Sequence, residues 1–371
     1  MSEHAYKKSN IFVRMFIPAR GDSKGNVIRK IISLLCIIVA IVCAAVVIPE
    51  YVRRDKDAGL INDLEDMMSQ NASGSFSIAQ QEVEQIKSEV PEIMDKFIDL
   101  YSQNSDIVGW LRVAGGEYIN YPVLMNEKDT DYYLHRDFNK EESIAGSLFC
   151  DNHVLPFTDA NNLLIYGHNM AGSKEYFSTL VSYDPYSTAG GGHNMDGDFI
   201  SYYKQYPTIQ FDTLWEEGTY KIFAGIYINT EDKDGYPYPY YKKRQFLNEL
   251  EFMDFMGNIM DRSTFYTGVD VEYGDQIITL STCCYTIGKD VDARFALFAR
   301  KVREGESAEV DVSKIVINPD PLFFDAYYQR RGGSWGGRTW DVDYPWLVTG
   351  FEEYTDIIDS LDNKEPESNR T

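Results

Sequence analysis

The chain has 371 residues, of which 44% are hydrophobic and 14% aromatic, so it carries enough apolar material for a large core. Its formal net charge of −23 argues against nucleic acid as a partner, because such proteins present basic surfaces. The charge is unevenly distributed. Residues 1–30 contain seven Lys and Arg against two acids, which makes this leader basic in an acidic chain.

The basic leader precedes a run of 19 uncharged residues, from Ile31 to Pro49. As a helix this run would be roughly 28 Å long, enough to cross the hydrocarbon core of a bilayer. Basic residues before a span favour a cytoplasmic N-terminus, so we predict a single-pass anchor at residues 31–52 with the rest of the chain extracellular. A cleaved signal peptide is the alternative, although the apolar run is longer than such peptides usually carry.

Five cysteines are present, and Cys36 and Cys43 fall within the predicted span. The remaining three, Cys150, Cys283 and Cys284, are too few for a disulfide scaffold in an external domain of this size. A thiol kept free in an oxidising compartment points modestly to chemistry.

Further elements follow in chain order. Residues 53–77 are polar and read as a stalk, and residues 78–101 have helical spacing that Pro91 should interrupt. Short β-branched and aromatic runs then predict strands at 110–113, 118–121, 123–124, 147–149, 162–166, 209–213, 219–228, 276–280 and 294–302. Many short strands with few long helices predict a mainly β fold, a closed or nearly closed barrel decorated with helices. One such helix is expected at residues 246–260.

About 65 residues follow the last predicted strand. We divide the chain into a leader (1–30), the span (31–52), the stalk (53–77), a catalytic domain (78–303) and an aromatic extension with an acidic tail (304–371). The aromatic residues of the extension should pack onto the barrel, with a lid or docking role as the weaker alternative. The residues after Asn363 are expected to be disordered.

The candidate chemistry lies at the ends of three predicted strands. Cys283 follows the strand at 276–280, Arg294 begins the next strand, and His168 follows the strand at 162–166. A cysteine nucleophile needs a base and a positive charge that favours the thiolate and the developing oxyanion, and these residues could supply both.

Each of these assignments has an alternative. Cys284 could be the nucleophile after a one-residue shift, and a disulfide between Cys283 and Cys284 would silence the thiol. His193 lies in a second copy of the sequence Gly-His-Asn-Met that contains His168, and is thus an alternative base. Its glycine-rich surroundings would not hold it rigidly. Arg294 could form only an ordinary ion pair with one of the nearby acids, Asp290 or Asp292.

Two motifs, Leu280-Ser281-Thr282-Cys283 and Tyr166-Gly167-His168-Asn169, occur together with Arg294. In combination they resemble a sortase, one of the cysteine transpeptidases of Gram-positive cell surfaces. The segments that resemble class B sortases are Asn104 to Leu111, Tyr121 to Leu124, Asp131 to Leu134, and Ala145 to Phe149 with Asp151. The resemblance covers roughly residues 80–303, with an interruption near 181–198, and the order of the motifs makes it specific.

This resemblance implies an eight-stranded barrel in which Cys283 is the nucleophile, His168 the base and acid, and Arg294 the group that stabilises the oxyanion. It also implies that Ser281 lines the substrate groove. The backbone N–H of Cys284 is a candidate oxyanion donor, and Thr282, placed among the substrate-binding residues, is expected mainly to pack in the barrel.

The implied reaction cleaves a C-terminal sorting pentapeptide of a secreted protein after Thr and transfers the acyl group to an amine. That amine belongs to a cell-wall precursor or a pilin, and an Asn-Pro signal is favoured over a Leu-Pro one. A hydrolytic cysteine peptidase and a catalytically silent surface scaffold remain alternatives. No cofactor is expected and no metal site is convincing, although acids such as Asp129 and Asp131 could attract Ca²⁺.

Overall fold

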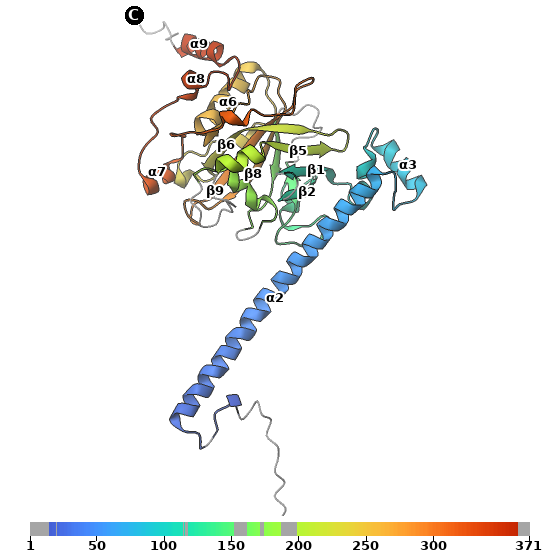
Figure 1. Ribbon diagram of the computed structural model, residues 1–371, viewed down its shortest axis with the longest axis vertical. Coiled ribbons are helices and arrows are strands. Elements are labelled where there is room, and N and C mark those ends of the chain that lie inside the picture. The colour runs from blue at the N-terminus through green and yellow to red at the C-terminus, as the bar shows by residue number, and fades with distance from the viewer. Residues whose placement is uncertain are drawn as a thin grey trace, which may run out of the picture. The chain divides into compact units, whose positions relative to one another are not determined.

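The structure is a computed structural model that describes residues 15–19, 21–113, 115, 118–151, 162–170, 174–186 and 199–362 (Figure 1). His193 and the tail after Asn363 lie outside these residues. The chain divides into two compact units, Met1–Glu65 and Asp66–Thr371. The predicted span and most of the predicted stalk form one helix, α2 (Lys24–Ala72), which is long and apolar enough to cross a membrane.

Two shorter helices precede the barrel. These are α3 (Gln80–Glu89) and α4 (Ile98–Gln103), and the chain leaves the helical conformation around Pro91 between them, as predicted. A 3₁₀ turn, η1 (Asp95–Phe97), leads directly into α4. The apolar stripe of this region is buried, which agrees with the prediction that these helices pack on the domain.

Eight strands close into a barrel in the order β1-β2-β3-β4-β8-β9-β6-β5 (Figure 1). They are β1 (Ile107–Val113), β2 (Ile119–Leu124), β3 (Leu148–Cys150), β4 (Asn162–Tyr166), β5 (Thr208–Thr213), β6 (Thr219–Asn229), β8 (Ile277–Cys284) and β9 (Ala293–Lys301). The predicted eight-stranded barrel is confirmed. The runs predicted at 118–121 and 123–124 form the single strand β2. A separate two-stranded sheet pairs β7 (Phe265–Tyr266) with β10 (Val316–Ile317).

Helices and 3₁₀ turns decorate the barrel. The helices are α5 (Phe199–Gln205), α6 (Glu249–Arg262), α7 (Asp325–Arg331), α8 (Trp340–Asp343) and α9 (Phe351–Asp362). The remaining 3₁₀ turns are η3 (Tyr132–His135), η5 (Phe177–Tyr183), η6 (Asp232–Asp234), η7 (Tyr240–Lys242) and η8 (Val312–Lys314). The predicted helix at 246–260 is α6, which begins at Glu249 because the side chain of Asn248 accepts a hydrogen bond from the Glu251 N–H at 2.9 Å.

Two apolar cores lie on opposite faces of the barrel wall. The inner core contains residues from all eight barrel strands, whereas the outer core joins β4, β6, β8 and β9 to α6 and to the C-terminal extension. Strand β8 contributes to both by simple alternation: Ile278, Leu280 and Cys284 belong to the inner core, and Ile277 belongs to the outer one. Side chains of β8 that are an even number of residues from Ile277 therefore lie on the outer face.

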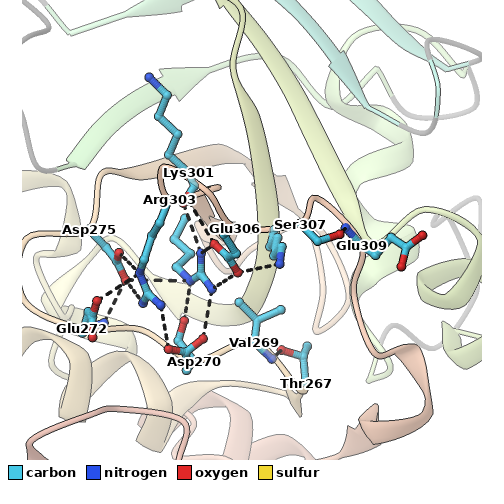
Figure 2. Close-up of polar contacts among 12 residues, drawn as sticks. Thr267, Val269, Asp270, Glu272, Asp275, Lys301, Arg303, Glu306, Ser307 and Glu309 are labelled. Atoms are coloured by element: carbon cyan, nitrogen blue, oxygen red, sulfur yellow. Dashed lines mark hydrogen bonds and ion pairs between the residues drawn. The ribbon is translucent and has the colours of Figure 1, made fainter.

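A network of charges around the buried Arg300 fixes the C-terminal end of β9. Arg300 is 1% exposed, and its guanidinium bonds the side chain and backbone carbonyl of Asp270 and both carboxylate oxygens of Glu306. Figure 2 shows Arg303 between Asp270 and Asp275, with Glu306 nearby. Each described charge of this network has an opposite partner, so the burial of Arg300 is compensated.

Candidate active site

The pairing of β8 with β9 sets Cys283 directly opposite Arg294. The strand predicted at 276–280 is longer in the structure, where β8 runs through Cys284 because its ladder with β9 continues to the pair Cys284 and Ala293. The cysteines are the last two residues of β8, so the thiol lies at a strand end, as predicted. Directly opposed residues in an antiparallel pair lie on the same face, so Cys283 and Arg294 are neighbours on the outer face of the barrel.

The two adjacent cysteines have different environments. Cys284 is buried in the inner core, its Sγ lies 3.2 Å from the Thr286 hydroxyl, and burial raises the pKa of its thiol to about 12. Cys283 is half-buried on the other face, and both thiols are free. Of the two, Cys283 is therefore the one that reagents and substrates can reach.

Arg294 is half-buried between two strands, opposite Cys283 on β8 and Ile228 on β6. Its guanidinium donates hydrogen bonds to the Asp292 carboxylate and, at 3.1 Å, to the Ala293 carbonyl. Burial acts to lower the pKa of Arg294, but Cys283 and Asp292 raise it overall. Of the two ion pairs suggested for Arg294, with Asp290 or with Asp292, the one with Asp292 is present. Arg294 forms this ion pair while it also lies opposite Cys283.

Strand β4 runs parallel to β8 and carries the chain to His168. The register pairs Tyr166 with Ser281, and beyond it the Gly167 N–H donates to the Ser281 carbonyl at 3.2 Å. The Thr282 hydroxyl donates to the Gly167 carbonyl at 2.8 Å. A side chain at Gly167 would meet Leu148 at 2.4 Å, so only glycine fits this close strand exit.

His168 is held at the same end of the barrel as Cys283. The next residue, Asn169, donates from its amide to the Cys283 carbonyl at 2.9 Å, which ties the exit of β4 to the backbone of Cys283. His168 Nε2 lies 2.9 Å from the Leu134 carbonyl. A carbonyl only accepts, so this contact assigns the proton of the neutral ring to Nε2 and leaves Nδ1 as the basic nitrogen.

The surroundings of His168 favour a neutral ring. Burial is the main cause that lowers its pKa, and the nearby His135 and Arg294 lower it further, while the Leu134 carbonyl acts in the opposite direction. The rings of His135 and His168 stack with centroids 5.7 Å apart. A neutral imidazole at neutral pH is the form that can accept a proton from a thiol.

The predicted substrate-binding residues have buried side chains. The Ser281 hydroxyl lies 2.6 Å from the Tyr240 hydroxyl, Thr282 is bonded to Gly167, and Cys284 faces the inner core. The buried side chains of all three residues therefore pack inside the protein and help to hold the site in place, as predicted for Thr282. The role of the Cys284 backbone N–H stays a prediction.

Two tyrosines that were not predicted from the sequence lie beside Cys283. Tyr285 is 44% exposed, and burial, followed by the Cys283 thiol, raises the pKa of this tyrosine. Tyr240 lies in η7, and burial raises its pKa to about 12. In a chain with 27 tyrosines, no local pattern distinguishes these two.

The chain is similar to known proteins over about half of its length. No protein-family model matches it. Sortase B of Listeria monocytogenes is 35% identical over 193 residues, which is 52% of this chain and 68% of the relative. Sortase B of Staphylococcus aureus is 28% identical over 210 residues, 56% of this chain and 76% of the relative.

The chain is also similar to solved structures of sortase B. The Staphylococcus aureus sortase B–substrate complex aligns at 27% identity with a TM-score of 0.46, covering 60% of this chain and 93% of that one. The family assignment rests on the sequence relatives, because the Listeria protein is matched over more than two thirds of its length at 35% identity. The chain belongs to the sortase B family.

Proposed function

We propose that the protein is a membrane-anchored transpeptidase that cleaves a C-terminal sorting pentapeptide after Thr through a thioacyl intermediate on Cys283. The observation that carries this proposal is the opposition of Cys283 and Arg294 across β8 and β9, with His168 at the exit of the adjacent strand β4. Membership of the sortase B family supports it. The secreted protein that bears the signal is the acyl donor, and an amine of a cell-wall precursor or a pilin is the acceptor.

In the first half-reaction His168 takes the proton of the Cys283 thiol, and the thiolate attacks the carbonyl carbon of the threonine. Negative charge builds on the carbonyl oxygen, where the guanidinium of Arg294 can donate hydrogen bonds in a planar fork. When the tetrahedral intermediate collapses, the peptide C–N bond breaks and His168 returns its proton to the leaving amine. The products are a thioester on Cys283 and the released C-terminal fragment.

In the second half-reaction an acceptor amine attacks the thioester. A new C–N bond forms, the C–S bond breaks, and the amine proton passes through His168 to the departing thiolate. Arg294 stabilises the same oxygen again. Water would give hydrolysis by the same route, so the distinction between a transpeptidase and a peptidase lies in which nucleophile reaches the thioester first.

The N-terminal part supports an extracellular location for this chemistry. Helix α2 is long and apolar enough to cross a membrane, and the basic leader favours its N-terminus in the cytoplasm. We assign residues 31–52 to the span, 53–77 to the stalk, 78–303 to the catalytic domain and 304–371 to the extension.

The test uses the full chain in detergent micelles with quenched peptides that carry Asn-Pro-x-Thr-x or Leu-Pro-x-Thr-x. Each peptide is incubated with and without a soluble primary amine, and the products are identified by mass spectrometry. We expect a product in which the threonyl fragment is joined to the amine, and faster peptide turnover when amine is present. Equal turnover with only a free threonyl acid would indicate a hydrolytic peptidase instead, and no turnover in the reduced protein would indicate a silent scaffold.

A further inference from the structure

The C-terminal extension is firmly attached to the outer core. Arg338 donates to both carboxylate oxygens of Asp261 on α6 at 2.7 and 2.6 Å, and the Trp340 indole N–H donates to the same carboxylate at 2.9 Å. The Phe351 ring packs on Trp340 with centroids 4.4 Å apart. Trp340 and Phe351 are buried, so the extension is an integral part of the fold.

From this attachment, α7 reaches the loop that joins β8 to β9. Arg330 Nη1 donates to the Ile287 carbonyl and to Asp290 Oδ1, each at 3.1 Å, and Nη2 donates to Asp290 Oδ2 at 2.5 Å. Arg331 adds a bond to the Thr286 carbonyl at 3.3 Å. A fork that binds a carboxylate with two donors also fixes its orientation, which a single contact would not do.

The backbone of this loop is shaped to receive the arginine. Gly288 has a φ of +146°, and a Cβ there would lie 2.7 Å from Arg330 Nη1 and 2.8 Å from the Asp290 carboxylate. Both the conformation and the close approach require glycine. The Arg330 guanidinium and the loop backbone at Gly288 therefore approach each other closely, although the Arg330 side chain is 37% exposed.

The extension also supports the loop through the inner core. The Ile287 N–H donates to the Tyr227 hydroxyl at 3.2 Å, and Tyr227 belongs to the same core as Cys284. Phe324 and Tyr327 pack edge-on against the Tyr227 ring, with centroids 5.3 and 6.4 Å away. Residues of the extension thus contact the loop directly and through the tyrosine beneath it.

The loop matters because the proposed machinery lies at both of its ends. It begins directly after Cys283 and Cys284 and ends at Asp292, two residues before Arg294 in β9. Its two carboxylates are divided between two arginines: Asp290 pairs with Arg330 and Asp292 pairs with Arg294. By holding Asp290, Arg330 fixes the loop from which Asp292 orients the guanidinium beside the nucleophile.

We propose that the C-terminal extension braces the β8–β9 loop and that Arg330 is a positioning residue, acting through Asp290 and the loop on Arg294 and Cys283. This inference rests on the proposed function for its activity readout only. An exposed ion pair alone contributes little, but the bidentate geometry and the backbone contact raise the expected effect to roughly five-fold in rate. The loss should fall on kcat, with KM changed by less than about two-fold, because Arg330 lies outside the proposed chemistry.

The test compares the full chain in detergent micelles with Arg330→Ala, with Gln329→Ala and with the exchange of Arg330→Asp and Asp290→Arg. Gln329 is an exposed residue of the same helix, so its variant is the matched control. The first readout is the pH dependence of Cys283 alkylation by iodoacetamide, mapped by mass spectrometry, which needs no substrate. Groups around Cys283 that could influence it are Arg294, Asp292, Tyr285, Tyr240, His168 and His135.

We expect Arg330→Ala to move the alkylation midpoint to higher pH, because Arg294 no longer favours the thiolate as strongly, and to lower kcat about five-fold. Gln329→Ala should behave as the unsubstituted protein, and the charge exchange should recover the midpoint. A profile for Arg330→Ala that superimposes on the control would overturn the brace, and so would a changed alkylation amplitude at an unchanged midpoint, because the surroundings of Cys283 in the folded protein would then be unaltered. If the unsubstituted protein alkylates but never transfers an acyl group, the proposed function fails, and the midpoint shift still decides the role of Arg330.

Discussion

The charge network at the far end of β9 makes Glu306→Gln a sharp test of how the barrel is held together. Glu306 accepts two bonds from the buried Arg300, at 2.7 and 2.8 Å, and one from Lys221 at 2.6 Å. The amide keeps the shape of the side chain but removes its charge. Arg300, which is 1% exposed, would then keep Asp270 as its close carboxylate partner.

The expected loss lies between two limits. Breaking a fully buried ion pair costs about 3–5 kcal/mol, whereas exposed pairs contribute about 0–1 kcal/mol. The Glu306 side chain is 25% exposed and Arg300 retains its bonds to Asp270, so we expect the free energy of unfolding to fall by about 2 kcal/mol at pH 7. Urea denaturation of the full chain in micelles, followed by tryptophan fluorescence, measures this difference.

The pH dependence of the same variant gives a second check. Bonds from Arg300 are the main cause that lowers the pKa of Glu306 below its usual range. A carboxyl with a lowered pKa contributes stability above its unfolded pKa of about 4.3 and loses it as pH falls toward the folded pKa. The difference in the free energy of unfolding between the unsubstituted protein and Glu306→Gln should therefore become smaller below about pH 4.

The matched control for this experiment is Glu309→Gln, the same chemical change three residues away (Figure 2). Glu309 is exposed and forms no ion pair among the described residues, so its variant should unfold within about 0.5 kcal/mol of the unsubstituted protein. A Glu306 variant as stable as this control at pH 7 would refute the reasoning, and so would a difference that does not depend on pH.

Three further predictions concern the site. Cys283→Ala should reduce acyl transfer by at least about 10³-fold while Cys284→Ala keeps most of it, as kcat/KM would measure; the opposite pattern would assign the nucleophile to Cys284. Arg294→Lys should lose about 10²–10³-fold in kcat despite its retained charge, because an ammonium cannot form the planar fork. A near-normal rate would reduce Arg294 to a structural partner of its neighbouring acid. His135→Asn should move the acidic limb of the pH–rate profile to higher pH, since His135 lowers the pKa of His168; a shift to lower pH would contradict this.

Much of the barrel could be predicted because its strands have strong local signals. The predicted bounds of β4 match the structure, and β6 and β9 differ by a single residue at their ends. The two sides of the β8–β9 hairpin also had to meet, so the approach of Cys283 to Arg294 followed from their strand positions.

The rest depends on contacts that no local pattern encodes. The parallel pairing of β4 with β8 joins residues 115 positions apart. The strand ends suggested that His168 and Cys283 could meet, and the family resemblance gave the two residues their expected roles. The extension was expected to pack on the barrel through its aromatic residues. Its bidentate contact with Asp290 depends on a tertiary arrangement of charged residues that are common throughout the sequence.

The most direct test of the central claim is to trap the acyl enzyme. The full chain in detergent micelles is mixed with an excess of a peptide that carries Asn-Pro-x-Thr-x, quenched in acid, digested and mapped by mass spectrometry beside Cys283→Ala. We predict a threonyl acyl group on Cys283, released by hydroxylamine as a thioester should be, and absent from the variant. An adduct on Cys284, or no adduct in the fully reduced protein with any sorting peptide, would contradict it.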